Sequence, residues 1–463
     1  MALGKRRRQQ QELWVATSQL ARSPGHPFYR KLNELLAEAG FDAWVEKLSE
    51  PYYAENGRPS IPLGVYFRMI FIGYFEGIGS QRGIAWRSSD SRSLSEFLGV
   101  PPTEPTPDHS SMTKVHQRLP QQVHEEVFRF VLKLAREKQL LDGKTVAVDS
   151  TTLEANAAMK SIARRDSGED WNEYLKRLAN EAGMENPTAE DLRRFDKSRE
   201  DKTVSNAAWQ STTDTDSRIA KMKDGTTHLA YKAEHVVDTK TDLVLAATVY
   251  RADQADTATL TDSVMEAQLN LEESGSDAEI RDVVADKGYH AATTLELADK
   301  QSLCTYIPEP QRRQRWNWKK RSAGQRAAVL ANRRRVRGER SKRLQRQRSE
   351  LSERSFAHVC ETGGARRSWL RGLVKVTKRY LIQVAARNLG LVMRKLFGMG
   401  TPRGLQTEGD LFCVVYLAIR VIRNRRKVTS SAKSRSVTIH VNPNRCPSSS
   451  TETIRKDHFS TGC

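Results

Sequence analysis

The stretch VVADKGYH (residues 283–290) carries more structural information than any other eight residues of this chain. Its β-branched apolar residues end in Asp286 and a Lys-Gly-Tyr-His turn, which is the pattern of a buried strand bounded by turn residues. An earlier stretch, VAVDSTT (146–152), repeats this design around Asp149. Open α/β sheets bind their ligands at the carboxyl ends of strands. The two aspartates are therefore candidates to share one divalent cation.

Strand and helix patterns alternate on either side of these stretches. A strand pattern at 144–151 is followed by a β-hairpin pattern at 228–238 and 243–250. The remaining patterns are a helix at 256–274, a strand at 281–288, a helix at 292–300 and a strand at 304–308. This order is that of a ribonuclease-H-like mixed α/β sheet, in which the first and fourth strands lie side by side. Asp149 and Asp286 would then be neighbours although 137 residues separate them.

Residues 1–140 are expected to form a separate all-α domain. FYRKLNELLAEAGF (28–41) and LGVYFRMIFIGYFEGI (63–78) carry apolar residues at helical spacing. Short helix patterns with tight turns fill residues 80–120 and resemble a helix-turn-helix assembly, so we expect this domain to bind DNA. Many all-α domains share this pattern without binding DNA.

The rest of the chain divides where its composition changes. Residues 141–400 are expected to form the α/β domain, with a polar and mostly helical insertion at about 157–225. Further helices are predicted at 348–364, where Gly363-Gly364 is a natural stop, and at 371–400. Residues 401–463 are rich in Ser, Thr and Arg and are expected to form a basic, polar, partly disordered tail.

The formal net charge of the 463-residue chain is +20, which makes a polyanion the expected partner. The basic segment 311–349 holds sixteen Lys and Arg residues and a single acid, Glu339. Trp316 and Trp318 lie among these arginines, and such interleaving suits phosphate neutralisation combined with stacking on exposed bases. A solvated helix face or a disordered basic linker would give the same composition. Even that alternative would hold nucleic acid electrostatically.

The remaining composition is typical of a protein of the reducing cytosol. Five cysteines are scattered without a CxxC pair, so neither a disulfide framework nor zinc-ligand spacing is indicated. The basic N-terminus lacks the apolar segment of a secretory signal. The apolar stretch at 411–422 is short and is interrupted by Arg420, so no membrane span is expected.

Four motifs in a fixed order carry a resemblance to a known family: VAVDSTTLEANAA, THLAYKAEHVVD, VVADKGYH and ERSFAHV. Over residues 27–395 the chain resembles the DDE transposases of bacterial insertion sequences, in particular the group whose ribonuclease-H-like core follows a helical N-terminal domain. VVADKGYH followed by ERSFAHV is the specific combination, whereas VDST alone says little. By this resemblance Asp149, Asp286 and Glu353 are the three catalytic acids and metal ligands.

Carboxylates suit this chemistry because the charge of a phosphodiester repels nucleophiles. Two Mg²⁺ ions about 3.5–4 Å apart activate the attacking oxygen and stabilise the leaving oxygen, and Mn²⁺ is expected to substitute for Mg²⁺. Mg²⁺ prefers oxygen ligands and keeps several waters, so three carboxylates suffice for two ions. For one aspartate considered alone, a turn former or helix cap is the commoner explanation.

Glu353 is the least constrained of the three acids. Glu350, Glu361 and Glu154 are alternatives that spacing does not exclude. The family's last acid lies on a helix and is followed by arginine and an aromatic residue. ERSF (353–356) matches that pattern, whereas Thr-Gly-Gly follows Glu361.

Further residues are candidates for contacts with DNA. Lys287, Tyr289 and His290 follow Asp286 directly, and a cap of the next helix is the alternative role of Tyr289 and His290. Arg354 is a candidate contact for a phosphate or a support for the third carboxylate. The expected DNA contacts are Lys287, Tyr289, His290, Arg312, Arg313, Arg315, Trp316, Trp318 and Arg354.

The function implied by this resemblance is that of a transposase. It would bind the terminal inverted repeats of its element, nick DNA by metal-assisted attack of water and join the freed 3′-hydroxyl to target DNA. The resemblance also implies a homodimer or higher multimer on double-stranded DNA. Two rivals remain open: a ribonuclease-H-like nuclease that cuts without joining, and a catalytically inactive DNA-binding protein derived from a transposase.

Overall fold

The computed structural model describes residues 25–405, except 201–203, 223–224, 312–317 and 319–320, together with residues 14, 16, 20 and 23. These residues belong to one compact unit of the chain, Met1–Gln406. None of the helices in this described part is both long enough and apolar enough to cross a membrane. The predicted tail lies outside the described residues from position 406 onward.

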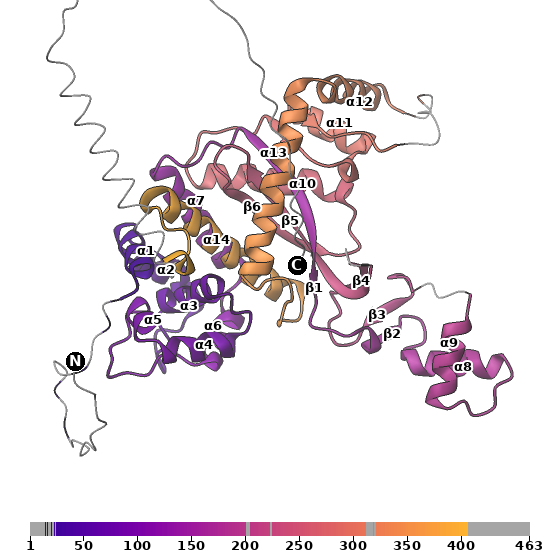
Figure 1. The fold of residues 1–463 in the computed structure, drawn as a ribbon, viewed down its shortest axis with the longest axis horizontal. Helices are drawn as coiled ribbons and strands as arrows, with labels where there is room; N and C mark the ends of the chain where they lie inside the picture. The colour runs from indigo at the N-terminus through magenta and orange to yellow at the C-terminus, as the bar shows by residue number, and fades with distance from the viewer. Residues whose placement is uncertain are drawn as a thin grey trace, which may run out of the picture. The chain divides into compact units, whose positions relative to one another are not determined.

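A six-stranded mixed sheet forms the centre of the fold (Figure 1). Its long middle strand β1 (Thr145–Glu154) is antiparallel to β5 (Thr227–Asp238) and parallel to β7 (Asp282–Val284). The outer strands are β8 (Cys304–Tyr306), parallel to β7, and β6 (Val244–Arg251) and β4 (Arg218–Lys221), which both pair with β5. The first and fourth predicted strands are therefore neighbours, and the ribonuclease-H-like α/β sheet predicted from the sequence is confirmed.

Helices cover both faces of the sheet, which explains why β5 is buried at almost every position. On one face α13 (Glu339–Phe356) packs against β1 and β5, and α14 (Leu373–Phe397) packs against β6. On the other face α10 (Asp256–Glu273) packs against β5 and β6. Successive strand residues point to opposite faces. Asp149 therefore contacts α13, whereas Ser150 contacts α10.

The N-terminal residues form the predicted helical region. It contains α1 (Pro27–Glu38), α2 (Phe41–Ser49), α3 (Leu63–Glu76), α4 (Gln81–Asp90), α5 (Arg92–Phe97), α6 (His109–Arg118) and α7 (Gln121–Glu137). The α3 helix is apolar on all sides and is buried along most of its length, because α2, α4 and α14 pack around it. Since α14 also packs along α7, the helical region and the sheet share one hydrophobic core. Position 140 therefore marks a change of secondary structure within continuous packing.

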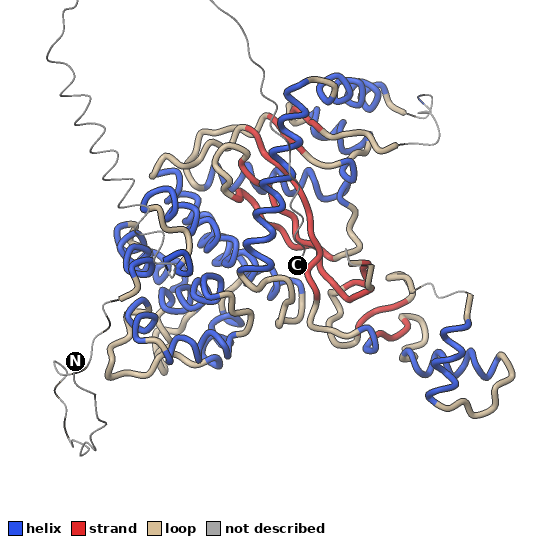
Figure 2. The backbone as a smooth tube through the Cα atoms, viewed as in Figure 1, coloured by secondary structure: helices blue, strands red, loops and turns tan. Residues whose placement is uncertain are grey.

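The insertion after β1 contains helices and strands. Two helices, α8 (Trp171–Glu181) and α9 (Ala189–Ser198), pack on each other around a small apolar cluster of their own. The strand pair β2 (Ile162–Arg164) with β3 (Trp209–Ser211) lies beside them (Figure 2). The expectation of a mostly helical insertion missed these strands, because three or four residues are too short to show an alternating pattern.

The basic segment is helical over most of its described length. The α12 helix (Ala323–Val336) packs on α11 (Ala292–Lys300) and β8. The α13 helix begins at Glu339, and the predicted start near 348 is wrong. Its buried face includes Ser341 and Gln345 besides Leu344, and such a polar face gives no hydrophobic periodicity. The helix continues as a π-helix over Ala357–Thr362 and then meets the predicted stop at Gly363-Gly364.

Candidate active site

The pairing of β1 with β7 places Asp149 and Asp286 beside each other. The parallel register sets Ala147 opposite Val284. Continued by two residues along both segments, the same offset sets Asp149 opposite Asp286, whose backbone is still extended. Residues of equal register on parallel neighbours point to the same face of a sheet. Both residues therefore follow the paired part of two neighbouring parallel strands, and this strand order is the one predicted from the sequence.

The Asp149 carboxylate is held by an arginine that the sequence did not single out. Arg348 of α13 donates from Nη1 to Asp149 Oδ2 at 2.7 Å, and the Ser150 N–H donates to Oδ1 at 2.9 Å. The exposed side-chain fractions are 13% for Arg348 and 27% for Asp149. A partly buried carboxylate needs a counter-charge, because burial alone disfavours its ionised form. Arg348 supplies that charge.

Asp286 has a less crowded environment. Its Oδ1 accepts the N–H of Gly288 at 2.7 Å, which caps the short 3-10 helix η4 (Lys287–Tyr289). Among the residues that the structure describes, no Lys, Arg or His side chain lies within ion-pair distance of Asp286. The half-buried Asp286 carboxylate is therefore open to a further ligand.

The α13 helix is fixed to the sheet at both ends of the candidate site. Gln345 Nε2 donates to the carbonyl oxygens of Ala285 at 3.0 Å and Tyr306 at 2.6 Å, which join the helix to the ends of β7 and β8. Farther along, the ring of Phe356 stacks on that of His235 with centroids 4.2 Å apart. These contacts determine which face of α13 turns toward Asp149.

Glu353 lies on another side of the same helix. It follows Arg348 by five residues, so the two side chains leave the helix about 140° apart. Glu353 is exposed and, within the described part of the chain, has no ion-pair partner. The three alternatives are each paired with an arginine: Glu350 with Arg354, Glu361 with Arg366 and Glu154 with Arg367. Glu353 is thus the one acid of the four that is not already neutralised by an arginine.

The residues present fit a hard cation in part. Asp149 and Asp286 offer carboxylate oxygens at one sheet edge, which is the donor type that Mg²⁺ prefers. However, no three acidic, His or Cys side chains within the described ranges lie close enough together to hold a metal ion. Arg348 forms an ion pair with the Asp149 carboxylate, and Glu353 lies on a different side of α13. The strand register therefore relates Asp149 to Asp286, and it does not include Glu353.

A buried polar network lies on the face of the sheet opposite to the Asp149 side chain and reaches the turn that carries Asp286. Lys232 Nζ donates to Asp256 Oδ1 at 3.0 Å, and Ser150 Oγ donates to the same oxygen at 3.0 Å. Tyr289 Oη donates to Glu234 Oε2 at 2.8 Å. Burial raises the pKa of Glu234 and raises that of Tyr289 well above its ordinary value. This network ties the η4 turn, and with it Asp286, to β5.

Tyr289 and His290 lie in the interior of the protein. Their exposed fractions are 1% and 5%, and His290 Nε2 lies 3.9 Å from Glu309. Their burial contradicts the expected contacts of these two residues with DNA. The reason is that η4 turns the tyrosine hydroxyl inward to the buried Glu234 carboxylate.

The other residues expected to contact DNA differ in their exposure and in their ion pairs within the protein. Lys287 is exposed beside Asp286, as a phosphate contact requires. Arg354 is paired with Asp242 at 3.3 Å and with Glu350, so its charge is already used within the protein. Trp318 is half-buried, with the Arg326 guanidinium 5.9 Å from its ring centroid. Arg312, Arg313, Arg315 and Trp316 lie outside the described residues.

Sequence reasoning missed two residues of this site, Arg348 and Asp256. Arg348 was counted only as charge within the basic segment. Asp256 begins α10, and a Cβ atom built on Gly288 would lie 2.9 Å from Asp286 Oδ1 and 3.1 Å from Asp256 Oδ2. The two carboxylates are therefore close neighbours. No sequence pattern pointed to Asp256, because this residue follows a turn and not the apolar run of a strand.

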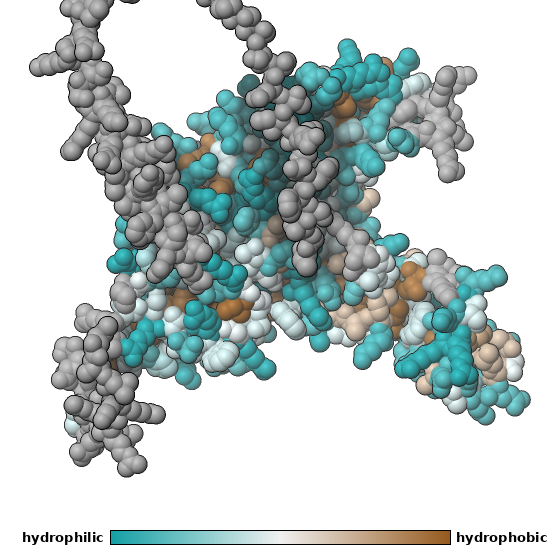
Figure 3. Space-filling model, in the orientation of Figure 1, coloured by the Kyte–Doolittle hydropathy of each residue, from teal (hydrophilic) through white to brown (hydrophobic). Residues whose placement is uncertain are grey.

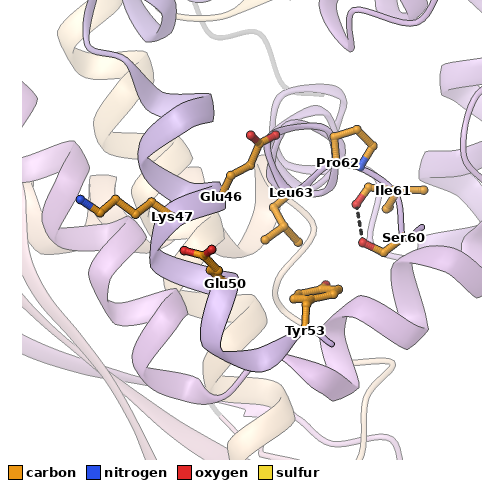
Figure 4. A pocket seen from close by; sticks show the side chains of 8 residues that line it. All are labelled: Glu46, Lys47, Glu50, Tyr53, Ser60, Ile61, Pro62 and Leu63. Carbon is orange, nitrogen blue, oxygen red and sulfur yellow. Dashed lines mark hydrogen bonds between the residues drawn. The ribbon is translucent and has the colours of Figure 1, made fainter. Parts of the chain in front are cut away.

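A hollow of about 420 Å³ lies in the helical region, beside α2 and the start of α3 (Figure 4). Its carboxylates Glu46 and Glu50 would repel a phosphate, and Figure 4 shows the Lys47 side chain pointing away from it. None of the predicted acids lines this hollow. We therefore assign it no part in the chemistry.

Two family models match the chain. Residues 17–118 match "Transposase domain (DUF772)", and residues 140–389 match "Transposase DDE domain". The second match covers more than half of the chain and includes β1, β7 and α13, with all three predicted acids. Neither the curated proteins nor the solved structures that were compared contain a match.

Proposed function

Because the chain belongs to the DDE transposases, we propose that it binds the terminal inverted repeats of an insertion sequence, cleaves DNA there and joins the freed 3′-hydroxyl to target DNA. The observation that supports this proposal is the parallel register of β1 and β7, which, continued two residues beyond Ala147 and Val284, would set Asp149 opposite Asp286. A nuclease that only cuts would use the same two carboxylates. Joining is therefore the step that separates the two functions.

Asp149 and Asp286 are the residues that would hold a first Mg²⁺ or Mn²⁺ ion, and Glu353 would complete a site for two ions. When bound, the ions would activate the attacking oxygen and stabilise the leaving oxygen of the phosphodiester. Glu353 suits this role because it has no arginine partner among the described residues. Moving its carboxylate to Asp149 would break no ion pair but would require α13 to turn or shift, because the Glu353 side chain leaves the helix about 140° from that of Arg348.

Arg348 has a separate role in the proposed reaction. Its guanidinium neutralises Asp149 before the ions bind, which stabilises a partly buried charge. When DNA arrives, a backbone phosphate is an alternative partner, because guanidinium groups bind phosphate oxygens through paired hydrogen bonds. We propose that Arg348 exchanges Asp149 for a phosphate and so frees the carboxylate to act as a metal ligand.

The helices α12 and α13 supply an electrostatic surface for DNA. Arg333 and Arg340 are used within the protein, in ion pairs with Glu309 and Asp282. Other basic side chains are exposed, namely Arg326, Arg334, Arg343 and Arg346 on the two helices and Arg337 between them. Figure 3 shows hydrophilic side chains covering α12. Binding through such a surface weakens steeply with salt, because each neutralised phosphate releases counterions.

The decisive experiment measures cutting and joining of a labelled terminal-repeat duplex with Mg²⁺ or Mn²⁺. Asp149→Asn and Asp286→Asn are expected to lower both activities by roughly a thousandfold or more, because each removes a metal ligand, while DNA binding persists. Asp282→Asn, at the other end of β7 and paired with Arg340, is the matched control and should keep its activity.

Each rival function predicts its own result in that experiment. Cutting without joined products would identify a nuclease. Binding without either activity in the unmodified chain would identify an inactive DNA-binding protein. Full cutting by Asp286→Asn would overturn the assignment of the two aspartates. We further propose that the protein acts in the cytoplasm as a dimer or higher multimer on double-stranded DNA, which sizing of the DNA complex tests.

A further inference from the structure

Residues 366–371, here called the strap, lie along the end of β1. The Glu154 N–H donates to the carbonyl of Arg366 at 2.9 Å, and the Ser368 N–H donates to the carbonyl of Glu154 at 2.9 Å. Glu154 and Arg367 thereby form a parallel bridge. Since β5 occupies the other edge of β1 along its length, the strap and β7 share one edge.

The position of the strap relates it directly to the two aspartates. β7 pairs with the start of β1, at residues 145–147, and the strap pairs with its last residue, Glu154. Asp149 lies on the stretch of β1 between these two partners. A DNA strand whose phosphodiester reaches the aspartates must therefore pass beside the strap.

Two polar residues after the first aspartate hold the strap in place. Asn156 Nδ2 donates to the carbonyl of Trp369 at 3.0 Å, and Arg371 Nε donates to the carbonyl of Asn156 at 3.3 Å. Arg367 Nε lies 3.8 Å from Glu154 Oε1. Glu154 and Asn156 therefore have a task that the sequence did not suggest, which is to fix the strap to β1.

One arginine of the strap reaches the face of the sheet that carries Asp149. Arg366 Nη1 donates to Thr151 Oγ1 at 3.1 Å and to the carbonyl of Thr152 at 2.9 Å. Thr151 follows Asp149 by two residues, so both side chains point to the same face. Two residues of strand correspond to about 7 Å, which is close to the spacing of successive phosphates along a DNA strand.

The strap also presents an aromatic ring to solvent. Arg367, Trp369 and Arg371 are exposed, whereas the residues between them are less so, which is the alternation of an extended segment. The Trp369 ring is 53% exposed, and the Arg367 guanidinium lies 5.3 Å from its centroid. A Cβ atom on Gly79 would lie 3.1 Å from Trp369 Nε1, so the edge of the indole rests against the turn between α3 and α4.

We propose that the strap holds the DNA strand at the cleavage site, with its exposed arginines Arg367 and Arg371 on the phosphates and Trp369 stacked on a base that has left the duplex. A ring that is held at its edge and open over half of its surface suits stacking, because every base offers a flat face. Arginines beside the ring at a sheet edge that carries two aspartates favour a nucleic acid as the partner. This inference rests on the proposed function of the same edge.

The test compares two labelled DNA probes of one sequence, a blunt duplex and a fork with short unpaired arms. Binding to the full chain is measured by fluorescence anisotropy without divalent metal, so that no cutting occurs. Trp369→Ala is expected to weaken binding to the fork by about fivefold or more, which is the loss of one base stack, and to leave binding to the duplex nearly unchanged. Trp369→Phe should keep most of the affinity for the fork.

Two further variants sharpen the result. Arg367→Gln is expected to weaken both probes alike, because both contain phosphates. Phe397→Ala is the matched control, since this ring is 39% exposed and lies 5.6 Å from Lys31 Nζ in a comparable cation–π pair away from the strap. It should leave both affinities unchanged.

The outcomes separate the strap from the proposed function. If Trp369→Ala keeps the ratio of fork to duplex affinity while the wild type binds both probes, the strap inference is overturned and the proposed function stands. Equal losses in Trp369→Ala and Phe397→Ala would also overturn the inference, since removing any exposed ring would then have the same effect. A wild-type chain that binds neither probe would overturn both.

Discussion

In the proposed function, the Arg348 guanidinium and a divalent cation would compete for the carboxylate oxygens of Asp149. Arg348 donates to Oδ2, and the ordinary role of that oxygen in a metal site is to accept a cation. Any cation must therefore displace Arg348 or share the carboxylate with it. The cost of displacement lowers the apparent affinity for metal until another anion, such as a DNA phosphate, receives the arginine.

Removing Arg348 should tighten metal binding in the absence of DNA. Arg348→Ala is expected to bind Mn²⁺ about tenfold more tightly than the wild type, because one charge-assisted hydrogen bond no longer has to be broken. Isothermal titration calorimetry measures this affinity directly. Arg346→Ala also removes one positive charge from α13 but is exposed, and it serves as the control. Unchanged or weaker Mn²⁺ binding by Arg348→Ala would contradict the competition.

Among the secondary-structure elements, α13 links the most parts of the site. Its Arg348 contacts β1, its Gln345 reaches the ends of β7 and β8, and its Phe356 stacks on β5. Two of these three contacts are polar. The position of α13 on the sheet therefore depends more on these specific hydrogen bonds than on the apolar surface that the helix buries.

A single atom change in Gln345 should loosen this docking. In Gln345→Glu a carboxylate would face the carbonyl oxygens of Ala285 and Tyr306, so two hydrogen bonds would be replaced by repulsion. We expect the free energy of unfolding at neutral pH to fall by roughly 2–4 kcal/mol. Urea unfolding measures this change, and acidification that protonates the new carboxyl group should restore part of it.

Gln347→Glu provides the comparison for that variant. Gln347 is exposed on the same helix, so its change adds the same charge without meeting a buried carbonyl. The stability of this variant should stay within about 0.5 kcal/mol of the wild type. Equal destabilisation by the two substitutions would mean that added charge, and not the lost hydrogen bonds, is responsible.

Elements that depend on local sequence signals could be predicted, whereas contacts between distant elements could not. The α11 helix begins and ends where it was predicted, and the β5–β6 hairpin was predicted from its alternating pattern and turn, because both depend on local signals. The proximity of Asp149 and Asp286 followed from strand order. The partner of Arg348 could not be predicted, since the face of α13 that turns toward the sheet is set by contacts with Ala285 and Tyr306.

Over the whole molecule, three buried histidines lie in the shared core, two in the helical region and one on β5. His116 and His124 both lie within hydrogen-bond distance of the Tyr66 hydroxyl, at 3.0 and 3.3 Å. His235 lies between Ser355 and the Tyr380 hydroxyl, at 3.0 and 2.8 Å. Burial lowers the pKa of each of these histidines to about 3. All three are therefore neutral in the folded protein at neutral pH.

The protein should consequently lose stability in mild acid. Unfolded histidines take up protons as the pH falls below 6.5, whereas the folded ones do so only near pH 3. The stabilisation is complete above pH 6.5 and falls by up to about 1.4 kcal/mol per pH unit for each ring. We expect the free energy of unfolding in urea to be roughly 3–4 kcal/mol lower at pH 5.5 than at pH 7.

A variant that lacks one of these rings tests the origin of this loss. His124→Gln should reduce the change between the two pH values by about a third, because one of three titrating groups is gone. Equal stability of the wild type at pH 7 and pH 5.5 would show that the three rings do not stay neutral in the fold.

The ion pair between Asp149 and Arg348 also has a consequence for biosynthesis. The two residues are 199 positions apart, so a ribosome that adds about 5–20 residues per second makes the arginine roughly 10–40 s after the aspartate. During that interval the nascent chain holds Asp149, and later Asp286, without the helix that carries Arg348 and Glu353. A message cut within the basic segment would therefore yield a protein with both sheet aspartates but no third acid, and such truncated products should be unable to cut DNA.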